Sequence, residues 1–108
     1  MRIEEIKKFI SEEHEFQLSK MDRSTNKDKR TLMRTVKLSE EVGELSEKVL
    51  HLLGQQRDEK VEKKDLKNIE EEIADVIICA MYLAKNIDVD FDLALERKIK
   101  VLESRRKK

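Results

Sequence analysis

Hydrophobic residues recur at three- and four-residue steps along most of the chain, which is the spacing of amphipathic helices. Four stretches carry this pattern, and they predict helices at about residues 2–20, 31–53, 66–86 and 91–105. In each stretch the apolar positions share one side, so each helix has a face to bury. The chain is therefore predicted to be a set of helices packed through their apolar faces.

Polar residues mark where these helices begin and end. The segment 21–29 is a connector whose turn formers can cap the second helix, namely Ser24, Thr25, Asn26 and Asp28. Gly54 is placed to end that helix as its C′ residue. Asp65 and Asp90 are expected to cap the third and fourth helices. The charged stretch 55–64 is left unassigned, and the basic end from Arg105 is expected to be frayed.

Composition supports an all-α fold. The 108 residues include no Pro and two Gly, 44% are charged and 4% are aromatic, which favours long helices over a β-sandwich or barrel. The length fits a single domain over residues 1–108. We predict a four-helix-bundle-type fold. Because the first and last helices are short and offer limited cover, we expect self-association as a homodimer or homotetramer.

Charge and cysteine usage narrow the function classes. Lys plus Arg and Asp plus Glu number 24 each, so no net field favours nucleic acid or an acidic membrane as partner. The single cysteine, Cys79, lies in an apolar run and is read as a small buried residue. No signal-type or membrane-spanning apolar stretch is present in the sequence, and we expect a cytoplasmic protein.

One acidic hexamer occurs twice: residues 40–45 read EEVGEL and residues 71–76 read EEIADV. On a helix, acids at positions i and i+3 share a face with Cβ atoms about 5–6 Å apart, and the neighbouring aliphatics turn that face toward the core. Gly43 and Ala74 make each helix narrow at this point, which is expected to let two helices approach closely. The pattern predicts that Glu41, Glu44, Glu72 and Asp75 are aimed inward together.

A cluster of buried carboxylates favours binding of a cation, because burying these charges unpaired is strongly unfavourable. A single E-x-x-E pair is usually a solvated face, as at Glu12 and Glu15, but two such pairs on two long amphipathic helices are not. A di-iron site of the ferritin type needs Glu-x-x-His pairs, which His14 and His51 do not supply. All-carboxylate ligation favours Mg²⁺, with Mn²⁺ as the alternative.

At these residues the chain resembles the MazG-like all-α nucleoside triphosphate pyrophosphohydrolase superfamily, which includes dimeric dUTPases and phosphoribosyl-ATP pyrophosphohydrolases. The family pattern is E-x-x-E on one helix and E-x-x-D on the next, read here at 41–44 and 72–75. The resemblance implies that Glu41, Glu44, Glu72 and Asp75 hold Mg²⁺ on a nucleoside triphosphate. The implied reaction is hydrolysis between the α and β phosphates, giving the monophosphate and pyrophosphate.

The resemblance also implies roles for residues near this pattern. A carboxylate among Glu40, Glu41 and Glu71 would orient the attacking water or accept its proton, and the choice between them stays open. Lys98 and Arg105 are candidates for phosphate contacts, although Leu102 stands where relatives have an asparagine.

Base recognition is implied for aromatic residues of the first helix. The candidates are Phe9 and Phe16, together with His14 and Gln17. The alternative for both phenylalanines is an ordinary place in the core. The preferred base stays open, because this helix lacks the tryptophan that some relatives have.

The leading hypothesis is thus a Mg²⁺-dependent hydrolase of nucleoside triphosphates, with non-standard or pyrimidine deoxynucleotides as expected house-cleaning substrates. Two alternatives are kept. One is a non-enzymatic helical module for self-association or partner binding, in which the acids are only a surface. The other keeps the fold and the metal but acts on phosphoribosyl-ATP.

Overall fold

A computed structural model describes residues 1–22, 24–58 and 63–107, and these residues form helices and no strand. The helices are α1 (Ile3–Lys20), α2 (Lys27–Asp58), α3 (Lys63–Asn86) and α4 (Phe91–Arg106). The all-α prediction is confirmed.

Two helix starts follow from the predicted caps. The side-chain Oδ1 of Asn26 accepts a hydrogen bond from the backbone N–H of Lys29 at 2.8 Å, so α2 begins at Lys27. Asp90 caps α4 in the same way, accepting from the N–H of Leu93 at 3.3 Å. Both residues were predicted as cap candidates from the sequence.

Four predicted boundaries are wrong. The second helix begins at Lys27 rather than at about Thr31, because Asn26 caps it inside the predicted connector. The second helix does not end at Gly54, which stays helical without a positive φ, and α2 runs on to Asp58. The segment 55–57 holds good helix formers and the chain has no proline to stop the helix. Asp65 does not cap α3, because the helix already begins at Lys63. Arg105 is not frayed but helical, since α4 ends at Arg106. The unassigned residues 59–62 and the last residue, Lys108, lie outside the described residues.

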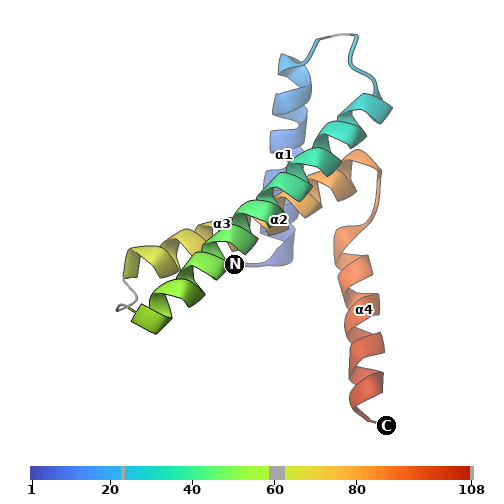
Figure 1. The fold of residues 1–108 in the computed structure, drawn as a ribbon. Coiled ribbons are helices and arrows are strands. Elements are labelled where there is room, and N and C mark those ends of the chain that lie inside the picture. The colour runs from blue at the N-terminus through green and yellow to red at the C-terminus, as the bar shows by residue number, and fades with distance from the viewer. Residues whose placement is uncertain (23, 59–62, 108) are drawn as a thin grey trace.

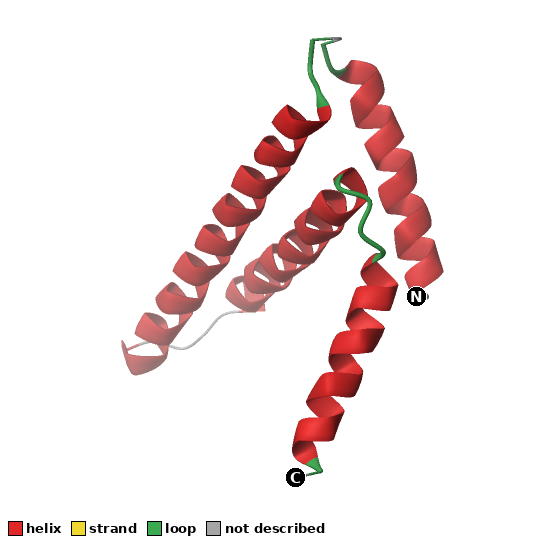
Figure 2. Ribbon diagram, turned by 90° about the vertical axis from the view of Figure 1, so that its right-hand side faces the viewer, coloured by secondary structure: helices red, strands yellow, loops and turns green. Residues whose placement is uncertain are grey.

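The centre of the structure is an antiparallel hairpin of α2 and α3, which lie side by side in Figures 1 and 2. Two contacts join the helices: Asn86 Nδ2 donates a hydrogen bond to Thr31 Oγ1 at 2.7 Å, and Lys48 Nζ lies 2.6 Å from Glu72 Oε1. Helix α1 crosses the C-terminal half of α3, whereas α4 runs away from the hairpin (Figure 1). The hairpin therefore brings the middle of α2 next to the first half of α3.

The chain alone is less compact than a globular domain. Its accessible surface is 8758 Å², whereas a compact monomer of this size exposes about 6,300 Å². Its radius of gyration is 17.4 Å, against about 13 Å for a compact domain of this length. The buried hydrophobic residues are Ile10, Met81 and Ala84, and no residue of α4 is buried.

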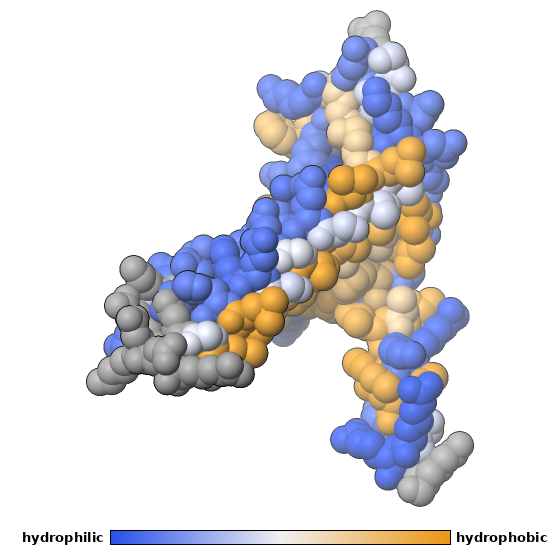
Figure 3. Space-filling model, viewed as in Figure 1, coloured by the Kyte–Doolittle hydropathy of each residue, from blue (hydrophilic) through white to orange (hydrophobic). Residues whose placement is uncertain are grey.

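Apolar side chains remain uncovered along the hairpin and on α4. They repeat at i, i+7 and i+11 on α2, as Val42, Val49 and Leu53, and at the same spacing on α3, as Leu66, Ile73 and Ile77. Figure 3 shows hydrophobic residues gathered along the edge of the hairpin and down α4. The predicted apolar faces are therefore present, but much of each faces solvent in the single chain.

Candidate metal centre

Acidic side chains from both hairpin helices converge at one place. Ligand oxygens of Glu41, Glu72 and Asp75 all lie within 4.8 Å of one another. Glu41 and Glu72 are each 6% exposed, whereas Asp75 is exposed to solvent. The antiparallel register causes this convergence, because it sets the E-x-x-E turn of α2 against the E-x-x-D turn of α3.

Glu44, the fourth predicted acid, borders the same cluster from the solvent side. It is exposed, and the pKa of its carboxyl is raised above the ordinary value, first by the charge of Glu41, then by that of Glu72, and further by desolvation. The structure thus brings three of the four sequence-predicted acids together, Glu41, Glu72 and Asp75. Glu44 is not among the acids whose ligand oxygens lie within 4.8 Å of one another.

Two oxygens at the centre of this cluster lack a hydrogen-bond donor. Oε2 of Glu41 and Oε2 of Glu72 are both buried and without a hydrogen-bond partner among the described residues. Burying an ionised carboxylate oxygen without a hydrogen-bond partner costs a large amount of free energy. The set offers only carboxylate oxygens, which are the ligands that hard divalent cations such as Mg²⁺ prefer. The residues present therefore fit a bound divalent cation.

The other oxygen of each buried carboxylate is paired with a lysine. Lys48 Nζ lies 2.6 Å from Glu72 Oε1, and Lys37 Nζ lies 3.0 Å from Glu41 Oε1. The hydrogen bond from Lys48 is the main cause that lowers the pKa of Glu72. Sequence analysis missed both lysines. The signal was their spacing, since each lies four residues outside the E-x-x-E pair.

The role predicted for Gly43 and Ala74 is wrong for the chain itself. Both positions are exposed, and a Cβ built on Gly43 meets nothing within 4 Å. The close approach of α2 and α3 at the acids does not depend on them.

Replacing Gly43 with alanine is accordingly expected to raise the free energy of unfolding by about 1 kcal/mol, because glycine is a poor helix former and no neighbour is crowded. Urea unfolding at fixed protein concentration measures this change. The matched control is Ala74→Gly, which should lose a similar amount. A loss of stability in Gly43→Ala would show instead that the position is crowded in the assembled protein.

Of the three predicted water-activating candidates, Glu41 belongs to the convergent set, whereas Glu40 and Glu71 lie outside it, as do the predicted phosphate contacts. Glu40 and Glu71 are exposed beside it, and Lys37 Nζ lies 3.9 Å from Glu40 Oε2. Lys98 and Arg105 are exposed on α4, which Figure 1 shows running away from the hairpin. Their roles stay predictions.

The phenylalanines of α1 do not form core. Phe9 is 48% and Phe16 is 56% exposed, and the ammonium of Lys20 lies 5.5 Å from the centroid of the Phe16 ring. The alternative of an ordinary core position is therefore wrong in the single chain, and both rings remain accessible for a base.

A small cavity lies one to two helical turns from the acids. Its volume is about 160 Å³, and it is lined by Gln17, Arg34, Lys37, Cys79 and Tyr82. The Arg34 guanidinium lies 4.6 Å from the centroid of the Tyr82 ring and donates a hydrogen bond to Oε1 of Gln17. Sequence analysis missed Arg34 and Tyr82, although each is seven residues from an acid of the cluster and shares its helix face. Burial raises the pKa of the Cys79 thiol and keeps it protonated.

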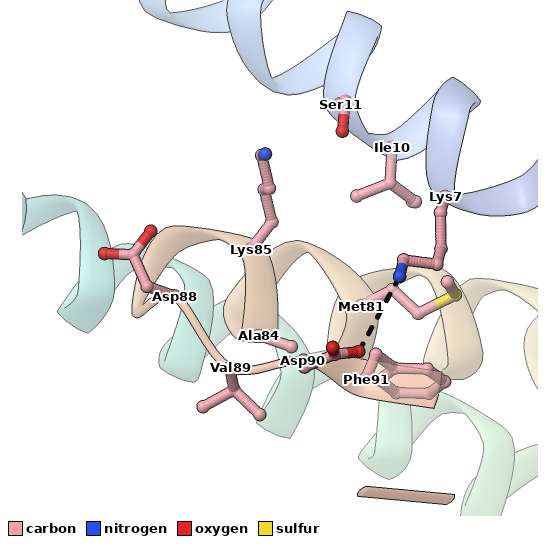
Figure 4. Close-up of a pocket in the computed structure, with 10 residues that line it drawn as sticks. All are labelled: Lys7, Ile10, Ser11, Met81, Ala84, Lys85, Asp88, Val89, Asp90 and Phe91. Carbon is pink, nitrogen blue, oxygen red and sulfur yellow. Dashed lines mark ion pairs between the residues drawn. The ribbon is translucent and has the colours of Figure 1, made fainter. Parts of the chain in front are cut away.

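A separate cavity of about 280 Å³ lies between α1 and the turn joining α3 to α4 (Figure 4). Its apolar wall is formed by Ile10, Met81 and Ala84, and at its rim Lys7 Nζ lies 3.6 Å from Asp90 Oδ1. None of the four predicted acids lines it, so this cavity is not part of the candidate metal centre.

The fold and the site define an all-α protein with a carboxylate cluster between two antiparallel helices. The chain belongs to the MazG-like family, whose sequence model matches residues 33–107. The match covers most of α2 and all of α3 and α4, including the four acids, and leaves out α1. Membership suggests chemistry of the nucleotide pyrophosphohydrolase type.

Comparison with curated proteins found no match, and neither did comparison with solved structures. Among the described residues, no helix has the length and apolar character needed to cross a bilayer.

Proposed function

We propose that the protein is a Mg²⁺-dependent nucleoside triphosphate pyrophosphohydrolase that releases a nucleoside monophosphate and pyrophosphate. The observation that carries the proposal is the pair of buried carboxylate oxygens, Oε2 of Glu41 and Oε2 of Glu72, that have no hydrogen-bond donor. They lie in the E-x-x-E and E-x-x-D turns that the family match includes. House-cleaning of non-standard or pyrimidine nucleotides is the role we propose for this activity.

In this proposal Glu41, Glu44, Glu72 and Asp75 hold the cation, with Mn²⁺ able to replace Mg²⁺. A bound divalent cation would supply charge neutralisation at the phosphates and acidify a water molecule. Glu40 and Glu71 stand next to the ligands in sequence and are open to solvent, so either carboxylate could accept a proton from the attacking water.

The nucleoside would occupy the side of the cluster that faces the Arg34–Tyr82 cavity. The cavity is close to the acids, and the Gln17 side chain and the Tyr82 ring offer polar and stacking contacts there. A wider hollow of about 540 Å³ shares Gln17, Arg34 and Lys37 with it. The exposed rings of Phe9 and Phe16 remain candidates for further base contacts.

We further propose that the functional protein is a homodimer or homotetramer. The excess surface and the uncovered apolar residues of α2, α3 and α4 need a partner, and a second copy supplies complementary faces. We assign the phosphate contacts of Lys98 and Arg105 to this assembly, because in the single chain α4 runs away from the acids.

Light scattering on a sizing column is expected to give twice or four times the mass of one chain. Ile77 is 49% exposed in the single chain, and placing a charge there as Ile77→Glu should shift the protein toward monomer. The exposed Glu70→Gln serves as the control and should keep the wild-type mass. A wild-type protein that runs as a monomer at micromolar concentration would contradict the assembly.

A substrate panel tests the proposed reaction. The protein is incubated with Mg²⁺ and each of the common and non-standard ribo- and deoxynucleoside triphosphates, and phosphoribosyl-ATP is included. The proposal predicts a monophosphate and pyrophosphate from at least one triphosphate. Release of orthophosphate would contradict cleavage between the α and β phosphates. No product from any compound would favour a helical binding module, and a product from phosphoribosyl-ATP alone would favour the alternative enzyme that acts on this compound.

A further inference from the structure

Two lysines of α2 flank its two acids, each four residues from the nearer acid. Lys37, Glu41, Glu44 and Lys48 stand at i, i+4, i+7 and i+11, which is one face of an α-helix. Each lysine is one turn beyond an acid, or about 6 Å along the helix axis. Both side chains are partly open to solvent: that of Lys37 is 56% exposed and that of Lys48 is 41% exposed.

Both ammonium groups use the carboxylates that a cation would need. Lys37 pairs with Glu41 in its own helix, and Lys48 reaches across to Glu72 of α3. The two carboxylates that they contact are the two whose other oxygen is buried and unpartnered.

The two sides of each pair differ in their freedom to move. The carboxylate side chains of Glu41 and Glu72 are each only 8% exposed and are held between the helices. The lysines are long, flexible and half in solvent, so their ammonium groups can turn outward without opening the hairpin. An ammonium group is also a common phosphate ligand that acts as a point charge.

We propose that Lys37 and Lys48 exchange partners when substrate binds. In the structure they pair with Glu41 and Glu72. When a divalent cation takes these carboxylates, the lysines turn to the phosphate oxygens of the triphosphate. This inference rests on the proposed function, and it adds two substrate-binding residues and a link between the cation and the nucleotide.

The exchange makes binding of the cation and binding of the nucleotide favour each other. Without nucleotide, each lysine competes with the cation for a carboxylate and repels it. With nucleotide, the phosphates accept the lysines and leave the carboxylates free for the cation. By linkage, the cation must strengthen nucleotide binding by the same factor.

The test measures two affinities in Lys48→Met and Lys37→Met. Calorimetric titration with Mn²⁺ alone should show binding about fivefold tighter than in the wild type, because a competing ion pair is gone. At saturating Mn²⁺, a triphosphate with a non-hydrolysable α,β-methylene bridge should bind about tenfold more weakly, because a charged phosphate contact is lost. Lys67→Met, an exposed change on α3, should leave both affinities unchanged.

Opposite shifts in the two affinities distinguish exchange from a merely structural pair, which would weaken cation binding or leave both affinities unchanged. Lys48→Arg is the second variant: it keeps the charge and should retain most of the nucleotide affinity. If the wild type binds Mn²⁺ but both methionine variants bind Mn²⁺ and nucleotide as the wild type does, the exchange is wrong and the metal site stands. If the wild type binds no Mn²⁺, the proposed function fails, and the exchange fails with it.

Discussion

Replacing Glu72 with glutamine is expected to lower kcat/KM for pyrophosphate release by about 10³-fold, the equivalent of several kcal/mol of electrostatic stabilisation at the phosphates. Glutamine keeps the size of the side chain but removes the charge. Glu72 is buried, shares the convergent site with Glu41 and Asp75, and carries an unpartnered oxygen. Initial rates at saturating Mg²⁺ measure the loss.

The matched control is Glu70→Gln, two residues earlier on the same helix and exposed. It removes the same charge without touching the cluster and should leave the rate unchanged. Circular dichroism shows whether Glu72→Gln keeps its helices. Equal rates for the two variants, or equal losses, would contradict a special role for Glu72.

The second large effect is on stability. Mg²⁺ at about 100 times its dissociation constant should add about 2.7 kcal/mol to the free energy of unfolding. For a domain of this size, such a gain raises Tm by roughly 10–20 °C. Thermal unfolding at one fixed protein concentration, with and without Mg²⁺, measures it. A helical module whose acids are only a surface would show almost no shift.

Glu44→Gln should change two quantities: the stability of the protein without Mg²⁺ and the gain in stability that Mg²⁺ gives. The pKa of Glu44 is raised, chiefly by the charge of Glu41 and then by that of Glu72. A carboxyl with a raised folded-state pKa destabilises the fold when ionised, so the metal-free protein loses stability as pH rises from the unfolded-state pKa through the raised value. At neutral pH, glutamine at this position should therefore stabilise the metal-free protein and sharply reduce the gain from Mg²⁺.

Glu47→Gln is the control for that variant, since Glu47 is exposed one turn further along α2. It should leave both the metal-free stability and the Mg²⁺ response as in the wild type. A metal-free Glu44→Gln protein that is less stable at pH 7 and unchanged at pH 4 would contradict the crowding of carboxylates at this site.

The helices could be predicted because their signals are local. Apolar spacing fixes the four segments, and the side chains of Asn26 and Asp90 cap their own helices. The end of α2 was predicted wrongly because glycine only weakens a helix by about 1 kcal/mol, which the favourable residues after Gly54 outweigh. Propensity alone does not fix where a helix without proline stops.

The acid cluster could also be predicted, because two consecutive helices joined by a short link pack antiparallel and set their acidic turns together. The lysines were missed for a physical reason. In a chain with 24 Lys and Arg residues, a lysine four residues from a glutamate is usually a solvated pair. The cross-helix contact of Lys48 with Glu72 depends on the register of the hairpin, which spacing within one helix does not reveal.

Burial was the property that sequence analysis judged least well. The apolar residues of α4 and the rings of Phe9 and Phe16 have the spacing or character of core, yet they are exposed in the single chain. A hydrophobic pattern shows that a face is to be covered, but not whether the cover comes from the same chain or from another copy.

The central claim is that the acids between α2 and α3 bind a divalent cation, and crystals grown with Mn²⁺ test it most directly through anomalous scattering. The account predicts a peak between the carboxylates of Glu41, Glu72 and Asp75, with ligand oxygens at about 2.1 Å and Oε2 of Glu41 and Glu72 among them. No peak at this place, with the carboxylates still paired only with Lys37 and Lys48, would contradict the account.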